Sequence, residues 1–251
     1  MSLPILAWFS AGAPSAVAAR LAVHEYGAEN VTILNTDVGS EHPDNARFIR
    51  DVSEWIGVPV GQLKSEKYRD TWQVWEERRF LVGPAGALCT TELKKKPRWA
   101  VQKDYGAQVY GYTAEPRERA RADRFRVQNP EVELLTPLID KGLTKGDCLA
   151  IIEDAGIAIP AMYALGYANN NCIVCVKGGM GYWNKIRRDF PDTFDRMAVL
   201  ERNIGHSLLS DNTGPVWLGD LDPTRGRYED EPDIECSLLC AAVEDELDST
   251  S

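Results

Sequence analysis

The sequence predicts an α/β protein, a Rossmann-like three-layer sandwich with a mostly parallel sheet, followed by a small C-terminal lobe that carries cysteines. Short apolar runs of strand length alternate with stretches of helical periodicity in the first part of the chain. After about residue 165 this alternation gives way to two cysteine pairs and an aromatic, basic helix. We therefore predict a core over residues 1–164 and a lobe over residues 165–251.

The first elements form successive βαβ units. Residues 4–9 are expected to form an apolar strand, residues 10–15 a turn of small residues, and residues 16–26 a helix. A second strand over residues 31–35 and a helix over residues 48–56 continue the alternation. Such alternation favours a parallel sheet that is covered by helices on both faces.

The later elements follow the same pattern until the chain turns acidic. Residues 107–112 are expected to form another strand, and a helix begins at Thr144, where Asp147 is placed for a capping box. The stretch from Asp220 onward is acidic, contains Pro and Gly, and is typical of a loop.

Composition and charge limit the class of protein. The 251 residues include 28 Lys and Arg against 38 Asp and Glu, a formal net charge of −10, and 44% are hydrophobic. This profile is typical of a globular protein and opposes nonspecific binding to nucleic acid. The apolar run over residues 3–9 is far shorter than the ~20 residues that span a bilayer, and no basic leader precedes it. We expect a cytoplasmic protein without a membrane partner.

The turn after the first strand is the favoured place for a phosphate. Ligands of parallel sheets bind beyond the carboxyl ends of the strands, where backbone N–H groups and a helix dipole point at them. Ser10, Gly12 and Ser15 lie in this turn, so the backbone can approach a phosphate closely and two hydroxyls can add donors. Asp37 follows the second strand and can contact a ribose or an adenine amino group. A plain connecting turn and a solvated acid are the alternatives.

Four segments in order resemble a known family. The turn over residues 10–15 resembles the pyrophosphate loop (PP-loop) of the adenine nucleotide alpha hydrolase superfamily, Ser-Gly-Gly-x-x-Ser. Residues 37–45 and 89–97 are similar to Asp-Thr-Gly-x-x-x-Pro-Glu-Thr and Cys-Cys-x-x-x-Lys-x-x-Pro of its phosphoadenosine phosphosulfate (PAPS) reductase branch. Residues 111–119 stand where that family has Gly-x-x-x-Glu-Ser-x-x-Arg. The resemblance covers most of residues 1–190 and implies nucleotide binding by Ser10, Gly12, Ser15, Asp37, Gly39 and Gly111.

The loop departs from the family pattern. Ala11 replaces a loop glycine, and Ala13-Pro14 stands where ATP-using members often have Lys-Asp, so one N–H and two charged groups are missing. The resemblance implies that Lys94, or Arg119 with Arg117, supplies positive charge for catalysis. Solvated helix faces are the alternative for these basic residues.

Two cysteine pairs predict a metal site. Cys172-x-x-Cys175 and Cys236-x-x-x-Cys240 together form a set of four thiolates suited to tetrahedral zinc. Small buried side chains or a redox dithiol are the alternatives.

The family resemblance adds a second metal assignment. Its iron–sulfur branch uses a tandem Cys-Cys and a later Cys-x-x-Cys, of which this chain keeps Cys89, Cys172 and Cys175 and has Thr90 for the missing thiol. Three thiolates, or four with Cys236, are a ligand set for a four-iron four-sulfur cluster.

Cys236 also bears on the type of reaction. PAPS reductases attack the sulfate sulfur with a mobile cysteine in Glu-Cys-Gly-[Leu/Ile]-His, and here Glu235-Cys236 matches only the first two residues. A thiolate that ligates a structural metal is not a nucleophile, so the two roles of Cys236 exclude each other.

Three functions remain open at this point. The first is an adenine-nucleotide-binding enzyme with ATP pyrophosphatase or sulfur-transfer chemistry, in which Lys94 and Arg119 stabilise the leaving group, with Mg²⁺ as an accompanying ion. The second is a thiol-dependent PAPS reductase that uses Cys236 and a thioredoxin-like or other sulfur donor. The third is a non-catalytic nucleotide-binding protein with structural zinc. The acceptor can be a small molecule or a nucleic acid at the basic clusters, and the superfamily often forms homodimers.

Overall fold

The computed structural model describes residues 4–83, 86–170, 172–232 and 234. The chain divides into two compact units, which are considered separately. Unit 1 comprises Met1–Asp37, His42–Lys64 and Lys95–Asn170, and unit 2 comprises Val38–Glu41, Ser65–Lys94 and Asn171–Ser251.

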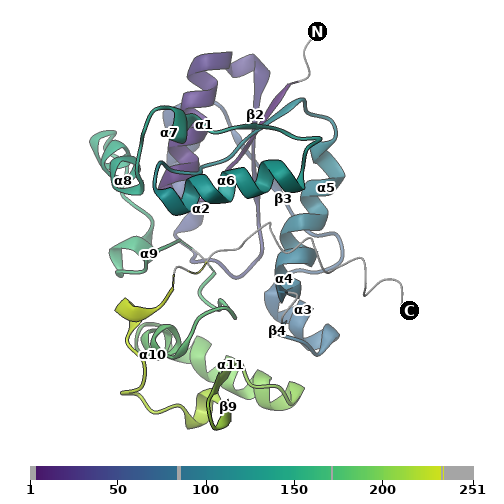
Figure 1. Ribbon diagram of the computed structural model, residues 1–251, viewed down its shortest axis with the longest axis vertical. Helices are drawn as coiled ribbons and strands as arrows, with labels where there is room; N and C mark the ends of the chain where they lie inside the picture. Colours follow the sequence, from purple (N-terminus) through teal and green to yellow (C-terminus); the bar gives the residue numbers. More distant parts are fainter. Residues whose placement is uncertain (1–3, 84–85, 171, 233, 235–251) are drawn as a thin grey trace. The chain divides into compact units, whose positions relative to one another are not determined.

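Unit 1 is built on a five-stranded parallel sheet (Figure 1). Its strand order is β3-β2-β1-β6-β7, so the chain first runs outward from β1 on one side and then returns to build the other side. The predicted α/β class is confirmed. The strands are β1 (Ile5–Trp8), β2 (Val31–Thr36), β3 (Val60–Leu63), β6 (Ala107–Val109) and β7 (Glu133–Leu135).

The order of the strands reverses between β1 and β6. In the register of the sheet, Ile5 of β1 is paired with Val31 of β2 on one side and with Ala107 of β6 on the other. The carboxyl ends of β1 and β6 therefore flank the reversal point, which is where open parallel sheets bind their ligands.

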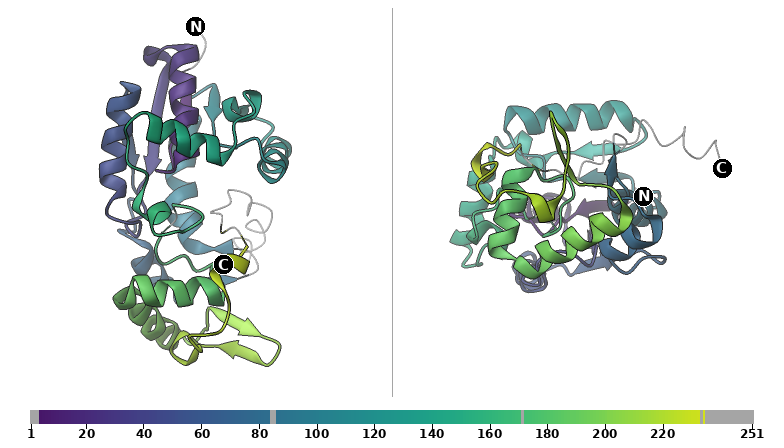
Figure 2. Two further views of the ribbon diagram at one scale, coloured as in Figure 1. Left: turned by 90° about the vertical axis from the view of Figure 1, so that its left-hand side faces the viewer. Right: turned by 90° about the horizontal axis from the view of Figure 1, so that it is seen from below.

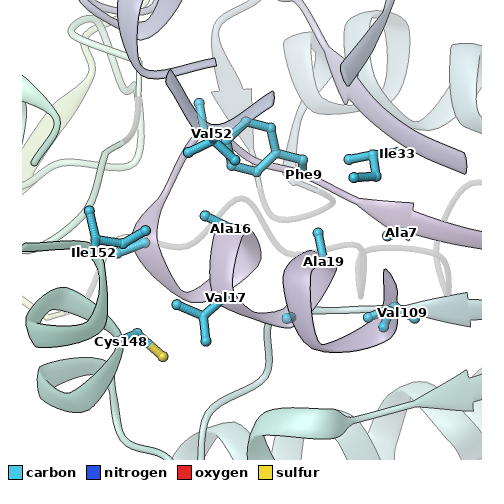
Figure 3. Close-up of a cluster of buried hydrophobic side chains, with 14 of the residues drawn as sticks. Ala7, Phe9, Ala16, Val17, Ala19, Ile33, Val52, Val109, Cys148 and Ile152 are labelled. Atoms are coloured by element: carbon cyan, nitrogen blue, oxygen red, sulfur yellow. The ribbon is translucent and has the colours of Figure 1, made fainter. Parts of the chain in front are cut away.

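Helices lie on both sides of this sheet, as the views in Figure 2 show. One face carries the main apolar core, in which Phe9 and Ile33 of the sheet side pack with Ala16 and Ala19 of α1 and with Ile152 of α8 (Figure 3). The small side chains of α1 let this helix lie close to the sheet. The helices of unit 1 are α1 (Ala13–Tyr26), η1 (Ala28–Asn30), α2 (Asn45–Ile56), α5 (Lys96–Gln102), α6 (Pro116–Gln128), α7 (Pro137–Asp140), α8 (Lys145–Asp154) and α9 (Ala161–Ala164).

The opposite face of the sheet is aromatic and contains a buried arginine. The ring centroids of Tyr110 and Phe125 are 4.9 Å apart, which places α6 against this face. The Arg98 guanidinium of α5 stacks 4.2 Å from the Trp8 ring centroid and donates to the Tyr110 hydroxyl. One layer of helices on each face of the sheet gives the expected three-layer sandwich.

Several boundaries differ from the predicted ones for local reasons. Helix α1 begins at Ala13, one turn before the predicted residue 16, because Pro14 fits the first turn of a helix, where its missing N–H is not needed. Strand β6 ends at Val109 instead of residue 112. The capping box of α8 is confirmed, since the Thr144 side chain accepts from the Asp147 N–H and the Asp147 carboxylate accepts in return from Thr144.

Unit 2 is mainly helical with two short antiparallel hairpins. Trp183 of α10 is fully buried, and its ring centroid lies 6.4 Å from that of Phe194 in α11, so these two helices share a core. Arg196 of α11 stacks 4.0 Å from the ring centroid of Trp72 in α3. The elements are α3 (Thr71–Arg78), β4 (Val82–Gly83), β5 (Gly86–Ala87), α4 (Leu88–Thr90), η2 (Thr91–Lys95), α10 (Met180–Asp189), α11 (Pro191–Ile204), β8 (Leu209–Asp211), β9 (Gly214–Val216), η3 (Leu218–Asp220) and η4 (Tyr228–Asp230).

A buried carboxylate organises the end of unit 2. Glu201 is fully buried and accepts hydrogen bonds from the backbone N–H groups of Leu208, at 3.1 Å, and Leu218. Burial raises the pKa of this carboxyl, whereas the two N–H donors favour its charged form.

Within the described part of the chain, no helix has the length and apolarity needed to cross a membrane.

Candidate nucleotide site

The β1–α1 loop lies at the carboxyl end of β1, beside the reversal point of the sheet. Gly12 is the N-cap of α1, and it has no side chain that could accept from the first N–H groups of the helix. A helix start without a side-chain cap offers N–H donors and the positive end of the helix dipole to an anion.

The two loop serines shape this loop. The Ser15 hydroxyl donates to the Gly12 carbonyl at 2.9 Å and accepts from the Ser10 N–H at 3.0 Å, while the two hydroxyl oxygens lie 3.1 Å apart. Ser15 is buried and Ser10 is exposed. The Ser15 proton is therefore used inside the loop, and the Ser10 hydroxyl is the one placed to reach a ligand.

Gly111, two residues after the end of β6, lies against the start of α1. A Cβ atom at this position would lie 2.7 Å from the Ser15 nitrogen and 2.9 Å from the Pro14 carbonyl carbon. Both are backbone atoms, so neither can move aside without shifting the first turn of the helix. The close approach therefore requires glycine at this position.

Ala11 adopts a backbone conformation that favours glycine. Its φ is +56° and its side chain is fully buried. A left-handed alanine costs roughly 1–2 kcal/mol relative to the right-handed region, and this is the position where the sequence departs from the glycine of the PP-loop. The side-chain amide of Asn170 donates to the Ala11 carbonyl at 2.6 Å and to the Asn45 side-chain oxygen at 2.8 Å.

The hydroxyl of Tyr163 also lies at the start of α1. A Cβ atom on Gly12 would be 3.1 Å from this oxygen, and the backbone N–H groups of Asn170 and Ala13 are directed at it. Burial raises the pKa of Tyr163 to about 12, against the smaller opposing effect of these N–H groups. The Tyr163 phenol is thus neutral near pH 7 at the start of α1.

Helix α9, which carries Tyr163, is held by α2. The Asp44 carboxylate accepts from the Ala161 N–H at 3.0 Å and is bound by two hydrogen bonds, of 2.7 and 2.8 Å, from the Arg47 guanidinium. Arg47 also donates to the carbonyls of Ala158 and Ile159. The Arg47 hydrogen bonds lower the pKa of Asp44, so this attachment is fully charged near neutral pH.

Asp37 lies at the same edge of the sheet but has a partner. Its carboxylate forms a 2.8 Å ion pair with the Lys64 ammonium, which follows β3. The carboxylate keeps 29% of its side-chain exposure, so it can still meet solvent. A role in nucleoside binding stays a prediction.

Gly39 and Lys94 belong to unit 2, whereas the loop belongs to unit 1. Gly39 has a φ of +66°, and a Cβ atom there would lie 2.7 Å from the Arg69 carbonyl oxygen, so local packing already requires this glycine. The Lys94 ammonium lies 4.0 Å from the Glu41 carboxylate. Their predicted roles at the nucleotide stay predictions.

Arg119 lies in unit 1 at the start of α6. Its Nε donates to the Ala114 carbonyl at 2.8 Å, and its guanidinium also approaches the Ile139 carbonyl at 3.5 Å. These contacts connect the segment after β6 to α7, while the side chain remains exposed. Arg119 is therefore a surface cation in the same unit as the loop, and its catalytic role stays a prediction.

The cysteines divide into described and undescribed positions. Cys172 and Cys175 are buried in unit 2, and the Tyr182 hydroxyl donates to the carbonyls of Cys172, at 3.1 Å, and Ile173, at 2.9 Å. Cys236 and Cys240 lie outside the described residues, so the four-thiolate zinc set is not tested.

The three-thiolate set for an iron–sulfur cluster lies wholly within the described residues. No group of three or more His, Cys, Asp or Glu side chains in that part of the chain is arranged to hold a metal ion. The structure therefore does not support a cluster on Cys89, Cys172 and Cys175. Cys148 is in the apolar core, and burial raises its pKa to about 12.

Comparisons with known proteins bear on the fold. No family model matches the sequence. An uncharacterised protein of Methanocaldococcus jannaschii is 22% identical over 228 residues, which cover 86% of this chain and 44% of that protein. The chain thus spans less than half the length of this curated relative.

Among solved structures, the phosphoadenylyl-sulfate (PAPS) reductase of Candida auris, crystallised as a phosphate complex, matches with a TM-score of 0.50. The match covers 67% of this chain and 80% of the reductase at 12% identity. The chain has a PAPS reductase-like fold. The resemblance inferred from the four sequence segments is confirmed at the level of the fold.

Sequence reasoning missed three residues of the loop's surroundings. Two of them, Tyr163 and Asn170, lie against the loop itself. The third, Asn45, accepts a hydrogen bond from Asn170. Pattern reading could flag Asn45, because it belongs to the segment similar to Pro-Glu-Thr. Tyr163 and Asn170 carry no sequence pattern of their own, since only the folding of the segment after α8 brings them to α1.

Proposed function

We propose that this chain is an adenine-nucleotide-binding enzyme that holds the phosphates of its substrate at the β1–α1 loop. The observation that carries the proposal is the close approach of Gly111, which follows β6, to Pro14 and Ser15 in the first turn of α1, a helix whose N-cap is a glycine. The PAPS reductase-like fold and the order of the family-like segments support the same site.

In this proposal the loop binds phosphate chiefly through its backbone and the Ser10 hydroxyl. The N–H groups at the start of α1 and the helix dipole favour negative charge without a basic side chain in the loop. Because the Tyr163 hydroxyl lies against Gly12, an arriving phosphate oxygen displaces a neutral group rather than an anion. Arg119 can then approach the outer phosphate oxygens as a charge-assisted donor.

The favoured chemistry is cleavage of ATP between its α- and β-phosphates. A nucleophile of the acceptor attacks the α-phosphorus, the bond to the bridging oxygen breaks, and pyrophosphate leaves with that electron pair. In sulfur transfer, the nucleophilic sulfur of a sulfur donor would then attack the adenylated acceptor, and AMP would leave with the electron pair of the broken bond. Lys94 and Arg119 are the residues proposed to stabilise the charge on the leaving pyrophosphate.

The fold likeness favours one second candidate, reduction of PAPS. In that reaction the Cys236 thiolate attacks sulfur, adenosine 3′,5′-bisphosphate leaves, and a second thiol from a thioredoxin-like donor releases sulfite while a disulfide forms. Sulfite release that is abolished by Cys236→Ser would establish this candidate. Pyrophosphate release that is unaffected by Cys236→Ser would exclude it.

Zinc is a separate proposal that concerns unit 2. Cys172 and Cys175 are buried at Cys-x-x-Cys spacing and would supply two of the four thiolates, with Cys236 and Cys240 as the others. The measurement is the zinc content of the purified chain beside that of Cys175→Ser. About one zinc per chain that is lost in the variant supports the clamp, and equal zinc contents in both proteins contradict it.

The test of nucleotide binding uses two glycine variants. Isothermal titration with ATP and with PAPS should show binding to the parent chain, and Gly111→Ala should weaken it at least tenfold by displacing the first turn of α1. Gly146→Ala is the matched control, because a Cβ atom there meets its nearest neighbour at an ordinary 3.7 Å. Equal affinities of Gly111→Ala and the parent would remove the loop from the site, and tight binding without product would indicate a binding protein.

A further inference from the structure

The β1–α1 loop contains a residue with a strained backbone, and this residue is not a glycine. Ala11 has a φ of +56° in the middle of the loop, with its side chain fully buried. The right-handed and extended regions are the ordinary choices for alanine. Some contact outside the loop must therefore favour the left-handed conformation over them.

Asn170 provides that contact. Its side-chain Nδ2 donates to the Ala11 carbonyl at 2.6 Å, and its second hydrogen is directed at the Asn45 side-chain oxygen at 2.8 Å. Asn170 is only 7% exposed and Asn45 only 4% exposed, so water does not compete effectively for these bonds. The amide therefore acts on the one carbonyl whose direction depends on the unusual turn.

The orientation of the Asn170 amide indicates which of its atoms matters. Its Oδ1 is buried and has no hydrogen-bond partner among the described residues. An unsatisfied buried acceptor is costly. The orientation is nevertheless the favourable one, because a flipped amide would set its oxygen against the oxygens of Ala11 and Asn45. The Nδ2 group of Asn170 therefore forms two hydrogen bonds, while its Oδ1 forms none within the described part of the chain.

We propose that Asn170 is a positioning residue for nucleotide binding, which holds Ala11 in the left-handed turn that the PP-loop otherwise assigns to glycine. This inference rests on the proposed function, because the loop is the phosphate site in both. The roles of Asn170 and Ala11 depend on each other, because the amide is needed only while the loop carries alanine. Replacing Ala11 with glycine should therefore make the amide dispensable.

The experiment is a double-mutant cycle on nucleotide affinity, with ATP and PAPS as the probes in isothermal titration. Asn170→Ala should weaken binding about tenfold, which is the factor expected when a strained loop loses the bond that selects it. Ala11→Gly alone should stay within twofold of the parent. The double variant should recover to within about threefold of the parent, because glycine adopts the turn unaided.

A structural role alone would not produce this recovery. If Asn170 only stabilised the fold, or contacted the nucleotide itself, then the double variant would stay as weak as Asn170→Ala, and the inference would be wrong. Equal affinities of Asn170→Ala and the parent would also overturn it. Asn184→Ala is the matched control, because it removes a side-chain amide in unit 2 that donates to the carbonyls of Asp222 and Arg225, and it should leave the affinity unchanged.

A measurement without nucleotide separates this inference from the proposed function. Hydrogen exchange of the amides of residues 11–16 should be at least tenfold faster in Asn170→Ala than in the parent, whereas amides of β2 should not change. If no protein in the series binds nucleotide but the exchange rates differ in this way, the proposed function fails and the positioning of the loop by Asn170 stands. Unchanged exchange rates overturn the positioning itself.

Discussion

Two helices, one in each unit, begin after a glycine that cannot accept hydrogen bonds from their first N–H groups, and these groups meet different acceptors. Helix α10 begins after the N-cap Gly179, and α1 begins after the N-cap Gly12, so neither cap has a side chain. At α10 the Glu231 carboxylate accepts from the N–H groups of Gly179, Gly181 and Tyr182 at 2.9, 2.7 and 3.3 Å. At α1 the neighbouring oxygen belongs to the neutral hydroxyl of Tyr163.

The difference supports the proposal that the start of α1 binds a ligand, whereas the start of α10 has a structural cap. A carboxylate on three N–H groups satisfies both the donors and the helix dipole, and an external anion gains little by replacing it. A phenol satisfies the donors less well and carries no charge. The start of α10 is thus occupied by the chain's own anion, whereas the start of α1 keeps its attraction for a phosphate.

The largest expected effect comes from removing the carboxylate at the start of α10, and it is a loss of stability of unit 2. Glu231→Ala should lower the free energy of unfolding by about 2 kcal/mol, because three N–H groups lose a charged acceptor. Urea unfolding followed by tryptophan fluorescence measures it. Glu229→Ala is the control, since that neighbouring side chain is exposed. Nucleotide affinity should stay unchanged in both, and a loss of affinity in Glu231→Ala alone would contradict the division of roles.

The next effect concerns the loop before α1. Ser15→Ala removes the acceptor of the Ser10 N–H and the donor to the Gly12 carbonyl, and it should weaken ATP binding about tenfold by loosening the phosphate loop. Ser207→Ala, which removes a hydroxyl in unit 2 that donates to the Leu209 carbonyl, should leave the affinity unchanged. The loop has no part in binding if both variants titrate like the parent.

A smaller effect is expected from the phenol itself. Tyr163→Phe should tighten ATP binding about threefold, roughly the value of one modest hydrogen bond, because the arriving phosphate no longer displaces a hydroxyl from the start of α1. Tyr105→Phe is the matched control, which should titrate like the parent. Weaker binding by Tyr163→Phe would show instead that the hydroxyl contacts the nucleotide.

The smallest effect is a difference in alkaline stability. The folded pKa of Tyr163, about 12, lies above its ordinary value of 10.0, so folding favours the neutral phenol. Its contribution to stability is complete below pH 10 and is lost as the pH rises from 10 to 12. The urea midpoint of the parent should therefore fall more steeply over this range than that of Tyr163→Phe. Parallel curves would show that the phenol is not held neutral at the helix start.

The sequence predicted the fold at the level of its layers, whereas the binding roles of the loop residues stay predictions. Alternating apolar segments predicted the sheet and its helices, because a segment shows its period in its own residues. The capping box at Thr144 was predictable for the same reason, since all its atoms lie within four residues. The requirement for glycine at residue 111 was not predictable from a local pattern, because it follows from the contact of Gly111 with a helix almost a hundred residues earlier.

What the sequence determined by itself was therefore local: the βαβ periodicity, the small-residue loop, the cysteine spacing and the substitution of alanine for a PP-loop glycine. Only the tertiary structure decided what surrounds that loop. It placed Asn170 on the Ala11 carbonyl and the Tyr163 hydroxyl on Gly12. The physical reason is that hydrogen bonds and close packing act over a few ångströms in space, whatever the distance along the chain, so residues with no common pattern become partners only when the chain is folded.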